Sequence, residues 1–266
     1  MNVKIKDKTG ATLYTAKQYL EEDIKVVLDD TLIPSGTIDI TENGEVDVTN
    51  YEKVNVNIAF NNDVLKGVVS GTITKLTAKD LEGVTSIRDY AFYGCSLTEV
   101  EIPNTVTTMG RNCFQNNKFE KFVIPDSVTN LSLYIVQGCT NLKEVTIGKG
   151  VKQLGNGVFD GCTALEYVEI PDNVTGISWY VFQRCSNLKK VKFGTGITSI
   201  SGCFSGCDSL KEIICLAENP PKLDAQNLNQ LPADCIFKVP ANSVEAYKNF
   251  TNWSARADYI IAYEGD

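Results

Sequence analysis

The chain of 266 residues contains no histidine, and this absence removes several classes of enzyme chemistry. Ser-His and Cys-His nucleophile pairs need an imidazole base, and many zinc sites need an imidazole ligand. No two of the nine cysteines have the C-x-x-C spacing of a zinc knuckle. We therefore expect no catalytic residues, no metal site and no cofactor, and we expect that the protein is not an enzyme.

Three further absences concern the partners and the setting. No apolar run approaches the roughly 20 residues that a membrane helix requires, so we expect no membrane insertion. The start of the sequence, MNVKIKDKTGATLYTAKQY, lacks the long apolar core of a secretory signal. Lys and Arg form no basic stripe, and the formal net charge is −8, so we expect no binding to nucleic acid.

What the sequence does contain is a block of about 23 residues that occurs six times within residues 84–219. Each block ends with a Leu-x-x-Val-x-Ile pattern, as in Leu165, Val168 and Ile170, which predicts a short strand with alternate residues inward. Further upstream, Phe159 and its equivalents mark another inward position. A period of this length predicts a solenoid, in which each repeat buries its apolar residues only by stacking on its neighbours.

Cysteine occupies the same position in five of the six repeats, and Asn117 occupies it in the other. These cysteines are Cys95, Cys139, Cys162, Cys185 and Cys207. Stacking would place them in a column with neighbours about 5 Å apart. Free cysteine is among the most buried residue types, so we expect buried thiols that pack each turn. Disulfides within the column are the alternative, and unpaired thiols favour folding in a reducing compartment.

The repeats resemble the BspA-type leucine-rich repeat family, whose units read roughly VTSIGDYAFYGCTSLTEVEIPDS. In this chain VTSIRDYAFYGCSLTEVEIPNT agrees in its spacing, its Cys, its Phe and its closing Ile-Pro. The resemblance covers residues 84–219 and implies a predominantly β fold, a right-handed leucine-rich-repeat solenoid. The segment VPANSVEAYKNFTNWSARADYIIAYE is similar to the one that ends many members of the family.

The resemblance implies a C-terminal cap over residues 220–266. Within it, SVEAYKNF predicts a short helix with Asn242 or Ser243 as its N-cap, and Trp253 is expected to anchor the core. Residues 61–83 have partial repeat character and are expected to form the N-terminal cap of the solenoid. Such caps cover the open edge that a sheet would otherwise present.

Residues 1–60 break the period and predict a small N-terminal β module. The stretch SGTIDITENGEVDVTNYEKVNVNIAF alternates apolar and polar residues, with Glu42, Asn43 and Gly44 as a hairpin turn. Part of it is similar to segments of phage and prophage tail or baseplate-associated proteins of Gram-positive bacteria. This likeness implies a virion-associated protein, or one assembled in the bacterial cytoplasm.

The outward positions of the repeat strands form the first candidate for partner binding, which we call the strand face. It contains two columns, namely Glu99, Lys121, Glu144, Tyr167, Lys190 and Glu212 in one, and Glu101, Val123, Thr146, Glu169, Lys192 and Ile214 in the next. Ile214 is expected to point outward in the second column. On the inner curve of a horseshoe these positions would present a broad surface to a protein or glycan.

Two other interpretations of the strand face remain open. One is a solvated sheet face, on which opposite charges pair between neighbouring strands at little gain in stability. The other is a carbohydrate-active enzyme, because the pairs Glu99 with Glu101 and Glu166 with Glu169 have the residue types of an acid and a base flanking a sugar.

Trp179 and Tyr180 form the second candidate for partner binding. The repeat position of Trp179 is mostly polar in the other repeats, and aromatic residues are enriched at binding hot spots. The alternative is that Trp179 packs locally over the next turn.

Taken together, the sequence predicts a non-enzymatic recognition protein that binds a protein or glycan on a cell or host surface. The two settings are a phage or prophage component and a bacterial surface adhesin, secreted with a signal outside this sequence.

Overall fold

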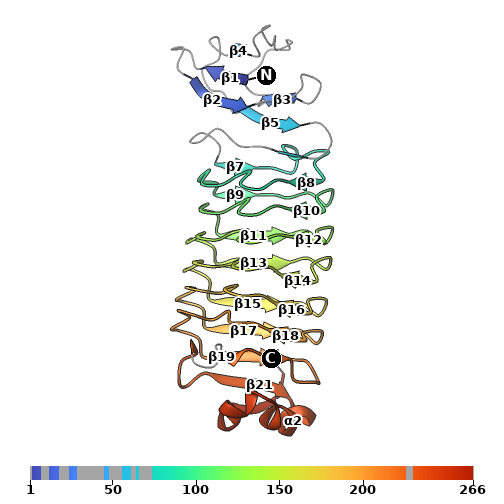
Figure 1. The fold of residues 1–266 in the computed structure, drawn as a ribbon, viewed down its shortest axis with the longest axis vertical. Helices are drawn as coiled ribbons and strands as arrows, with labels where there is room; N and C mark the ends of the chain where they lie inside the picture. The colour runs from blue at the N-terminus through green and yellow to red at the C-terminus, as the bar shows by residue number, and fades with distance from the viewer. Residues whose placement is uncertain are drawn as a thin grey trace.

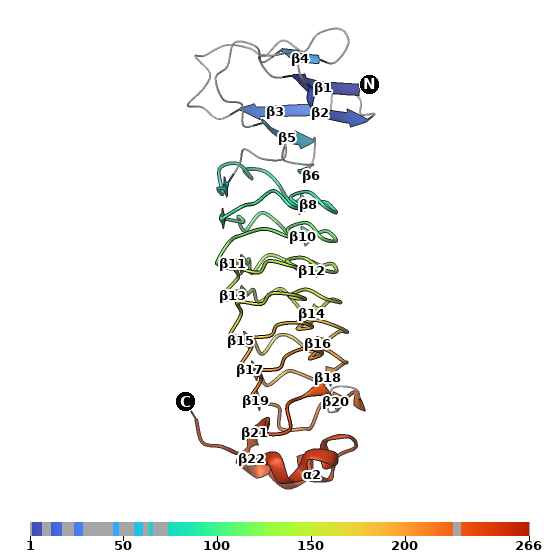
Figure 2. The same ribbon diagram turned by 90° about the vertical axis from the view of Figure 1, so that its left-hand side faces the viewer.

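A computed structural model describes residues 74–225 and 230–265 in full, and the backbone of six strands that precede them. From residue 74 onward the chain winds into a parallel β-solenoid, and the whole chain makes about eight turns. The turns rise in a straight stack, with the C-terminal helix at one end (Figures 1 and 2). The solenoid predicted from the repeat period is therefore confirmed.

Each turn of the solenoid carries two strands on different sides, and Figure 1 shows them as two separate columns. The first column holds β7 (Lys75–Leu76), β9 (Glu99–Val100), β11 (Lys121–Ile124), β13 (Glu144–Ile147), β15 (Tyr167–Ile170), β17 (Lys190–Phe193), β19 (Glu212–Cys215) and β21 (Ile236–Pro240). The second holds β8 (Ser86–Ile87), β10 (Thr108–Met109), β12 (Asn130–Leu131), β14 (Gln153–Leu154), β16 (Gly176–Ile177), β18 (Ser199–Ile200) and β20 (Lys222–Leu223). We call these the long-strand and short-strand sides.

A third side connects each short strand to the next long strand, and we call it the turn segment. It has no strands, but its backbone is still bonded from repeat to repeat: Phe159 N donates to Val181 O at 3.0 Å, and Phe182 N donates to Cys203 O at 3.0 Å. The turn segments of the second to fifth repeats each wind through two residues with positive φ, for example Gly157 at 61° and Gly161 at 72°. Glycine adopts this conformation without steric cost, whereas other residues rarely do.

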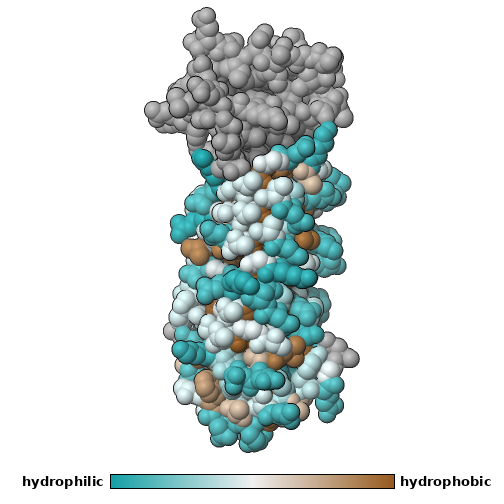
Figure 3. Space-filling view, turned by 90° about the vertical axis from the view of Figure 1, so that its right-hand side faces the viewer, coloured by the Kyte–Doolittle hydropathy of each residue, from teal (hydrophilic) through white to brown (hydrophobic). Residues whose placement is uncertain are grey.

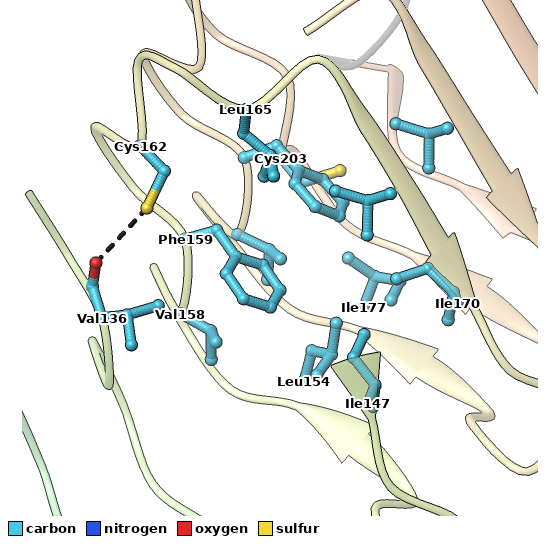
Figure 4. Close-up of a cluster of buried hydrophobic side chains, with 14 of the residues drawn as sticks. Val136, Ile147, Leu154, Val158, Phe159, Cys162, Leu165, Ile170, Ile177 and Cys203 are labelled. Atoms are coloured by element: carbon cyan, nitrogen blue, oxygen red, sulfur yellow. Dashed lines mark hydrogen bonds between the residues drawn. The ribbon is translucent and has the colours of Figure 1, made fainter. Parts of the chain in front are cut away.

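The core is a set of apolar columns that run through the stack. Phe159, Phe182 and Phe204 are almost completely buried, and their rings stack at centroid distances of 5.8 and 5.7 Å. Figure 4 shows Phe159 packed among Leu154, Ile170 and Ile177, which come from different sides of the turns. Most of the inward positions predicted from the alternation are buried as expected, because each repeat closes the apolar face of the one before it. Val100, Ile102, Leu131 and Val145 are only partly buried.

The column of equivalent cysteines is also buried, as predicted. None of the nine cysteines forms a disulfide. The Cys162 thiol donates to the carbonyl oxygen of Val136 at 3.3 Å, a bond drawn in Figure 4. Burial raises the pKa of Cys162 well above its ordinary value, and it raises the pKa of Cys139 to about 12. Asn117 fits the same buried position because its amide donates to Phe92 O and Phe114 O, both at 2.8 Å.

The C-terminal segment first adds strands to the stack and then covers its end. β20 pairs with β18, and β21 pairs with β19 and with the last strand, β22 (Ile260–Tyr263). Between β21 and β22 lie η2 (Ala241–Ser243), α2 (Val244–Asn249) and η3 (Trp253–Tyr259). Ser243 is the N-cap of α2, as predicted, although its side chain makes no capping bond.

Trp253 is the anchor of this end of the molecule, as the sequence indicated. Its side chain is completely buried, and its Nε1 donates to Pro221 O at 2.8 Å. Its ring meets Tyr247 edge-on at 4.8 Å and Phe237 at 5.2 Å. The Tyr247 hydroxyl donates to Ala217 O at 2.7 Å, so both polar groups of this aromatic cluster are satisfied.

The part of the chain that the structure describes before residue 74 contains six short strands. They are β1 (Asn2–Lys6), β2 (Thr12–Lys17), β3 (Ile24–Leu28), β4 (Glu45–Asp47), β5 (Val56–Phe60) and β6 (Val64–Leu65). β1 pairs antiparallel with β2 and parallel with β4, whereas β3 and β5 form an antiparallel pair. β5 pairs with β6, which pairs with β8 of the solenoid. The predicted turn at Glu42, Asn43 and Gly44 lies outside the described residues, and the predicted domain limits stay predictions.

Both strand columns are interrupted at the level between the third and fourth repeats. Among the described residues, no ladder joins β13 to β15 or β12 to β14, and the long-strand column alone is also interrupted between β9 and β11. The turn segment crosses this level without a break: Tyr134 N donates to Asn156 O at 2.9 Å, and Val136 N donates to Val158 O at 3.1 Å. The third and fourth repeats are therefore held together by the turn segment and the core, with side-chain bonds such as that from Asn173 to Gly148 O.

Candidate partner-binding surfaces

The long strands bring the predicted strand-face residues into register. Lys121 lies opposite Glu144, Tyr167 lies opposite Lys190, and Glu169 lies opposite Lys192. The expectation that they line the inner curve of a horseshoe was wrong, because the stack is straight (Figure 2). Curvature needs one side of a turn to be thicker than the other. Here the turn segment and most of the long strands are joined to the next repeat by backbone hydrogen bonds at the strand spacing, so the strand face is a flat strip.

Charged residues of the strand face pair with one another across neighbouring strands. Closest approaches between nitrogen and oxygen are 2.7 Å for Lys75–Glu99, 3.4 Å for Lys121–Glu144, 3.2 Å for Lys190–Glu212 and 3.5 Å for Lys192–Glu169. Glu101 accepts a bond from Ala78 N at 3.4 Å. Exposed pairs of this kind contribute about 0 to 1 kcal/mol each to stability, so they set the charge pattern of the surface more than its stability.

Glu212 is the most enclosed carboxylate of these pairs. It lies between Lys190 and Lys238, whose Nζ atoms approach it to 3.2 and 2.6 Å. Partial burial alone would raise the pKa of Glu212, but the hydrogen bonds from Lys238 and Lys190 outweigh it and lower the pKa. The carboxylate therefore stays ionised between its two lysines.

Tyr167 and Val123 are the apolar residues exposed on the strand face, each at 40%. The Tyr167 hydroxyl donates to Glu169 Oε2 at 3.2 Å, and Lys190 Nζ lies 5.7 Å from the Tyr167 ring centroid. Partial burial raises the pKa of Tyr167, and the neighbouring Glu169 adds to this shift. The ring is thus held in a defined position among charges while much of it faces outward.

Ile214 corrects one detail of the predicted surface. We expected it to point outward, but its side chain is completely buried. It stands in register between Lys192 and Lys238 on the adjacent strands, and the aliphatic stems of these lysines flank it. The second outward column is therefore well exposed only as far as Glu169, because the Lys192 side chain is 15% exposed.

Trp179 and Tyr180 lie in the turn segment, away from the long strands that carry the other predicted residues. Their ring centroids are 6.2 Å apart with an interplanar angle of 47°, and Tyr180 is 44% exposed whereas Trp179 is half-buried. Trp179 O accepts a bond from Gly157 N at 3.0 Å. The predicted residues therefore fall on two surfaces, the strand face and the turn segment.

A third surface escaped the sequence analysis. Two tyrosines from the first repeat and one from the third line a shallow hollow of about 580 Å³ on the turn segments. The remaining lining residues are Arg111, Asn112, Gln115 and Gln137. The sequence did contain a signal for this surface, namely that Tyr90 and Tyr134 occupy the same repeat position as the predicted binding residue Tyr180. Their meeting in one hollow depends on the stacking of three repeats.

The carboxylate pairs considered for sugar hydrolysis are engaged with lysines. Glu166 Oε2 lies 2.8 Å from Lys189 Nζ, and Glu169 is shared between Lys192 and Tyr167. Within residues 74–225 and 230–265, no group of three or more His, Cys, Asp or Glu is placed to hold a metal ion.

Among the described helices, none is long and apolar enough to cross a membrane. Seen from the short-strand side, the described surface is hydrophilic or near neutral with scattered hydrophobic residues (Figure 3).

Turns that each contribute a short parallel strand and a buried Leu, Phe and Cys define a leucine-rich repeat solenoid, a kind of protein that mediates protein binding or adhesion. The chain belongs to the family described as BspA type leucine rich repeat region, which matches in six copies over residues 70–189, 108–226 and 134–255. Solenoids of this family are typically non-catalytic.

Solved structures share this fold at low sequence identity. A leucine-rich repeat protein of T. pallidum superposes with a TM-score of 0.58 at 24% identity, over 65% of this chain and 84% of that one. A leucine-rich repeat protein from Eubacterium ventriosum gives 0.58 at 23% identity, over 66% of this chain and 50% of that one. The chain thus aligns with only half of the Eubacterium protein. No curated protein matches the chain significantly.

Proposed function

We propose that the protein is a non-enzymatic recognition protein whose strand face binds a protein partner on a cell or host surface. The observation that carries the proposal is the position of Tyr167, an aromatic ring that is 40% exposed within a column of charged residues. Tyrosine is enriched among the few residues that supply most of the energy of an interface. A ring of polar residues around such an anchor is typical of the rim that excludes water from it.

The charges on both sides of Tyr167 favour a partner with its own charge pattern. Lysines and glutamates occur together along the column, and the pairs Lys75–Glu99 and Lys121–Glu144 are exposed on both sides and therefore weak. A partner can replace these pairs at little cost, and a complementary pattern would contribute specificity and a faster association rate. The strands are held in register, so the surface needs little ordering on binding.

The proposed setting is a phage or prophage component that folds in a reducing cytoplasm. Two observations support it, the likeness of the N-terminal segment to tail-associated proteins and the column of buried thiols that form no disulfides. A bacterial surface adhesin is the second candidate, favoured by membership of a repeat class that mediates adhesion. Immunogold labelling of phage particles and of whole bacterial cells would separate the two settings.

The experiment that tests the binding function compares the intact protein with two variants on arrays of bacterial surface proteins, host extracellular proteins and glycans. The first variant combines Tyr167→Ala and Lys190→Glu on the strand face. The second, Lys152→Glu, makes the same charge change at an exposed position before the short strand β14.

We expect a protein ligand whose binding is lost in the strand-face double variant and kept in Lys152→Glu. Equal binding by all three proteins would remove the site from the strand face. The absence of any protein ligand would contradict the proposed function. Circular dichroism and thermal unfolding of each variant confirm that the stack is intact before binding is compared.

A further inference from the structure

The hollow on the turn segments of the first three repeats, which we call the tyrosine hollow, combines aromatic rings with polar groups. Tyr90 is 52% exposed and Tyr93 is 47% exposed, and their ring centroids lie 6.0 Å apart at an interplanar angle of 60°. Tyr134 closes another side of the hollow. The hollow is shallow and open, with a volume of about 580 Å³.

The backbone shows that the fold does not require tyrosine at these positions. Tyr90 and Tyr134 have φ angles of 59° and 56°, a region that bulky residues rarely adopt. The same position is held by Asn112 in the second repeat and by Gly157 in the fourth, two residue types that tolerate it well. Residues held in such conformations cluster at binding sites, where the strain serves a function.

The polar groups of the hollow are oriented by contacts behind them. Asp89 Oδ1 accepts the backbone N–H of Arg111 at 2.6 Å, which fixes the loop that carries the guanidinium. Gln137 Nε2 donates to Asp160 Oδ2 at 2.6 Å, so its amide oxygen is left to accept from a ligand. Asp160 is itself held by two bonds from Arg184, at 3.0 and 2.7 Å. This arrangement presents both donors and acceptors at defined places.

Arg111 is the charged residue of the lining. Its side chain is exposed, and no ion pair joins it to another residue in the described ranges. Asn112 Nδ2 and Gln115 Oε1 bond to each other beside it, so these amides are fixed relative to the guanidinium. A guanidinium binds a carboxylate with two parallel hydrogen bonds, which a neutral hydroxyl group cannot match.

We propose that the tyrosine hollow binds an acidic sugar residue. The apolar face of a sugar ring would lie on Tyr90 or Tyr93, its hydroxyl groups would bond to Gln115 and Gln137, and its carboxylate would pair with Arg111. The mixture of rings, amides and one guanidinium matches this chemistry better than it matches an apolar peptide. The inference rests on the proposed recognition function, but it assigns a glycan to a surface separate from the strand face.

Isothermal titration with a hyaluronan tetrasaccharide and with sialyllactose tests the proposal, with lactose and maltotetraose as neutral probes. Tyr90→Asn removes the ring but keeps a residue that adopts positive φ, so the fold is preserved. Tyr180→Asn is its matched control at the same repeat position outside the hollow. Arg111→Gln removes the guanidinium, and Arg88→Gln is its control on an exposed arginine of the first repeat.

We expect saturable binding of at least one acidic probe, weakened about tenfold by Tyr90→Asn and by Arg111→Gln, and unchanged in both controls. Absence of binding to both acidic probes, or binding that Tyr90→Asn leaves unchanged, would overturn the proposal. Equal affinity for lactose or maltotetraose would overturn the role of Arg111. The strand-face double variant should keep its affinity for the acidic sugar, because the tyrosine hollow is a separate surface. Loss of sugar binding in the hollow variants and loss of protein binding in the strand-face variant are therefore independent results.

Discussion

The thiol of Cys185 lies 3.1 Å from the carbonyl oxygen of Phe159, which belongs to the preceding repeat. The same bond joins Cys139 to Phe114 O at 3.3 Å and Cys207 to Phe182 O at 3.0 Å. One buried position therefore links each of these turns to the turn before it. Asn117 does so with a stronger donor in the repeat that lacks cysteine.

Replacing Cys185 tests the stabilising role of this column. Cys185→Ala removes a weak donor and leaves a small cavity, so we expect a loss of about 1 to 2 kcal/mol in the free energy of unfolding. Cys235→Ala is the control, because this buried cysteine lies outside the column, its sulfur is 3.9 Å from Ile236 O, and its replacement should cost less. Urea denaturation measures both. Equal stability of Cys185→Ala and the natural chain would contradict the role assigned to the bond.

Alkaline pH should destabilise the fold through these thiols. Burial raises the pKa of Cys139 and Cys207 to about 12 from an ordinary value of 9.0. Between these pH values the unfolded chain releases the thiol protons and the folded chain keeps them. The free energy of unfolding should therefore fall by about 1.4 kcal/mol per pH unit for each such thiol.

Urea denaturation from about pH 8 to about pH 11 checks this dependence, with Cys139→Asn as the comparison. The variant copies the Asn117 arrangement and lacks one thiol, so its stability should fall less steeply with pH. Parallel pH profiles for the two proteins would show that the buried Cys139 thiol does not contribute.

Arg184 should matter more to stability than the exposed lysines of the strand face. It pairs with Asp160, whose side chain is only 4% exposed, and the hydrogen bonds with this carboxylate raise the pKa of Arg184. Arg184→Ala would leave a buried carboxylate without its cation, and we expect a loss of about 2 kcal/mol.

Lys189→Ala is the control, because its pair with Glu166 is exposed on both sides and should contribute less than about 1 kcal/mol. Thermal and urea unfolding of the two variants give the comparison. A loss in Lys189→Ala as large as that in Arg184→Ala would contradict the distinction. Because Asp160 also holds Gln137, Arg184→Ala is further expected to weaken sugar binding in the tyrosine hollow.

The interrupted level between the third and fourth repeats should open more readily than the rest of the stack. β15 pairs with β17 on one side, but no ladder joins it to β13 in the described part of the chain. Hydrogen exchange with mass spectrometry should therefore show faster exchange in β15 than in β17, which is paired on both sides. Uniform protection across β15, β17 and β19 would show that the stack behaves as a single unit.

Much of the fold could be predicted from the sequence because equivalent positions of the repeats carry similar residue types, which indicate whether the position is buried. The position of Phe159 recurs as an apolar residue in every repeat, and that of Cys162 recurs as a small polar one, so burial could be predicted for both columns. Trp253 was predictable as an anchor for a different reason, because the exposed end of a stack must be covered by apolar residues.

The candidate sites were less predictable because they depend on relations between repeats. Alternation correctly gave the outward direction of Tyr167, but it gave the wrong exposure for Ile214, which two lysine stems flank. The tyrosine hollow was missed because Tyr90 and Tyr134 are in different repeats and Tyr93 is at a different position within its repeat.

The sequence by itself determined the period, the strands and the inward columns, because a stack of near-identical turns buries the same position every time. Only the tertiary structure decided the straightness of the stack, the separation of Trp179 from the strand face and the grouping of three tyrosines around Arg111. The physical reason is that these features depend on how closely successive turns approach on each side. That spacing is set jointly by the backbone hydrogen bonds and the packing of all the turns, and it is not encoded in any single repeat.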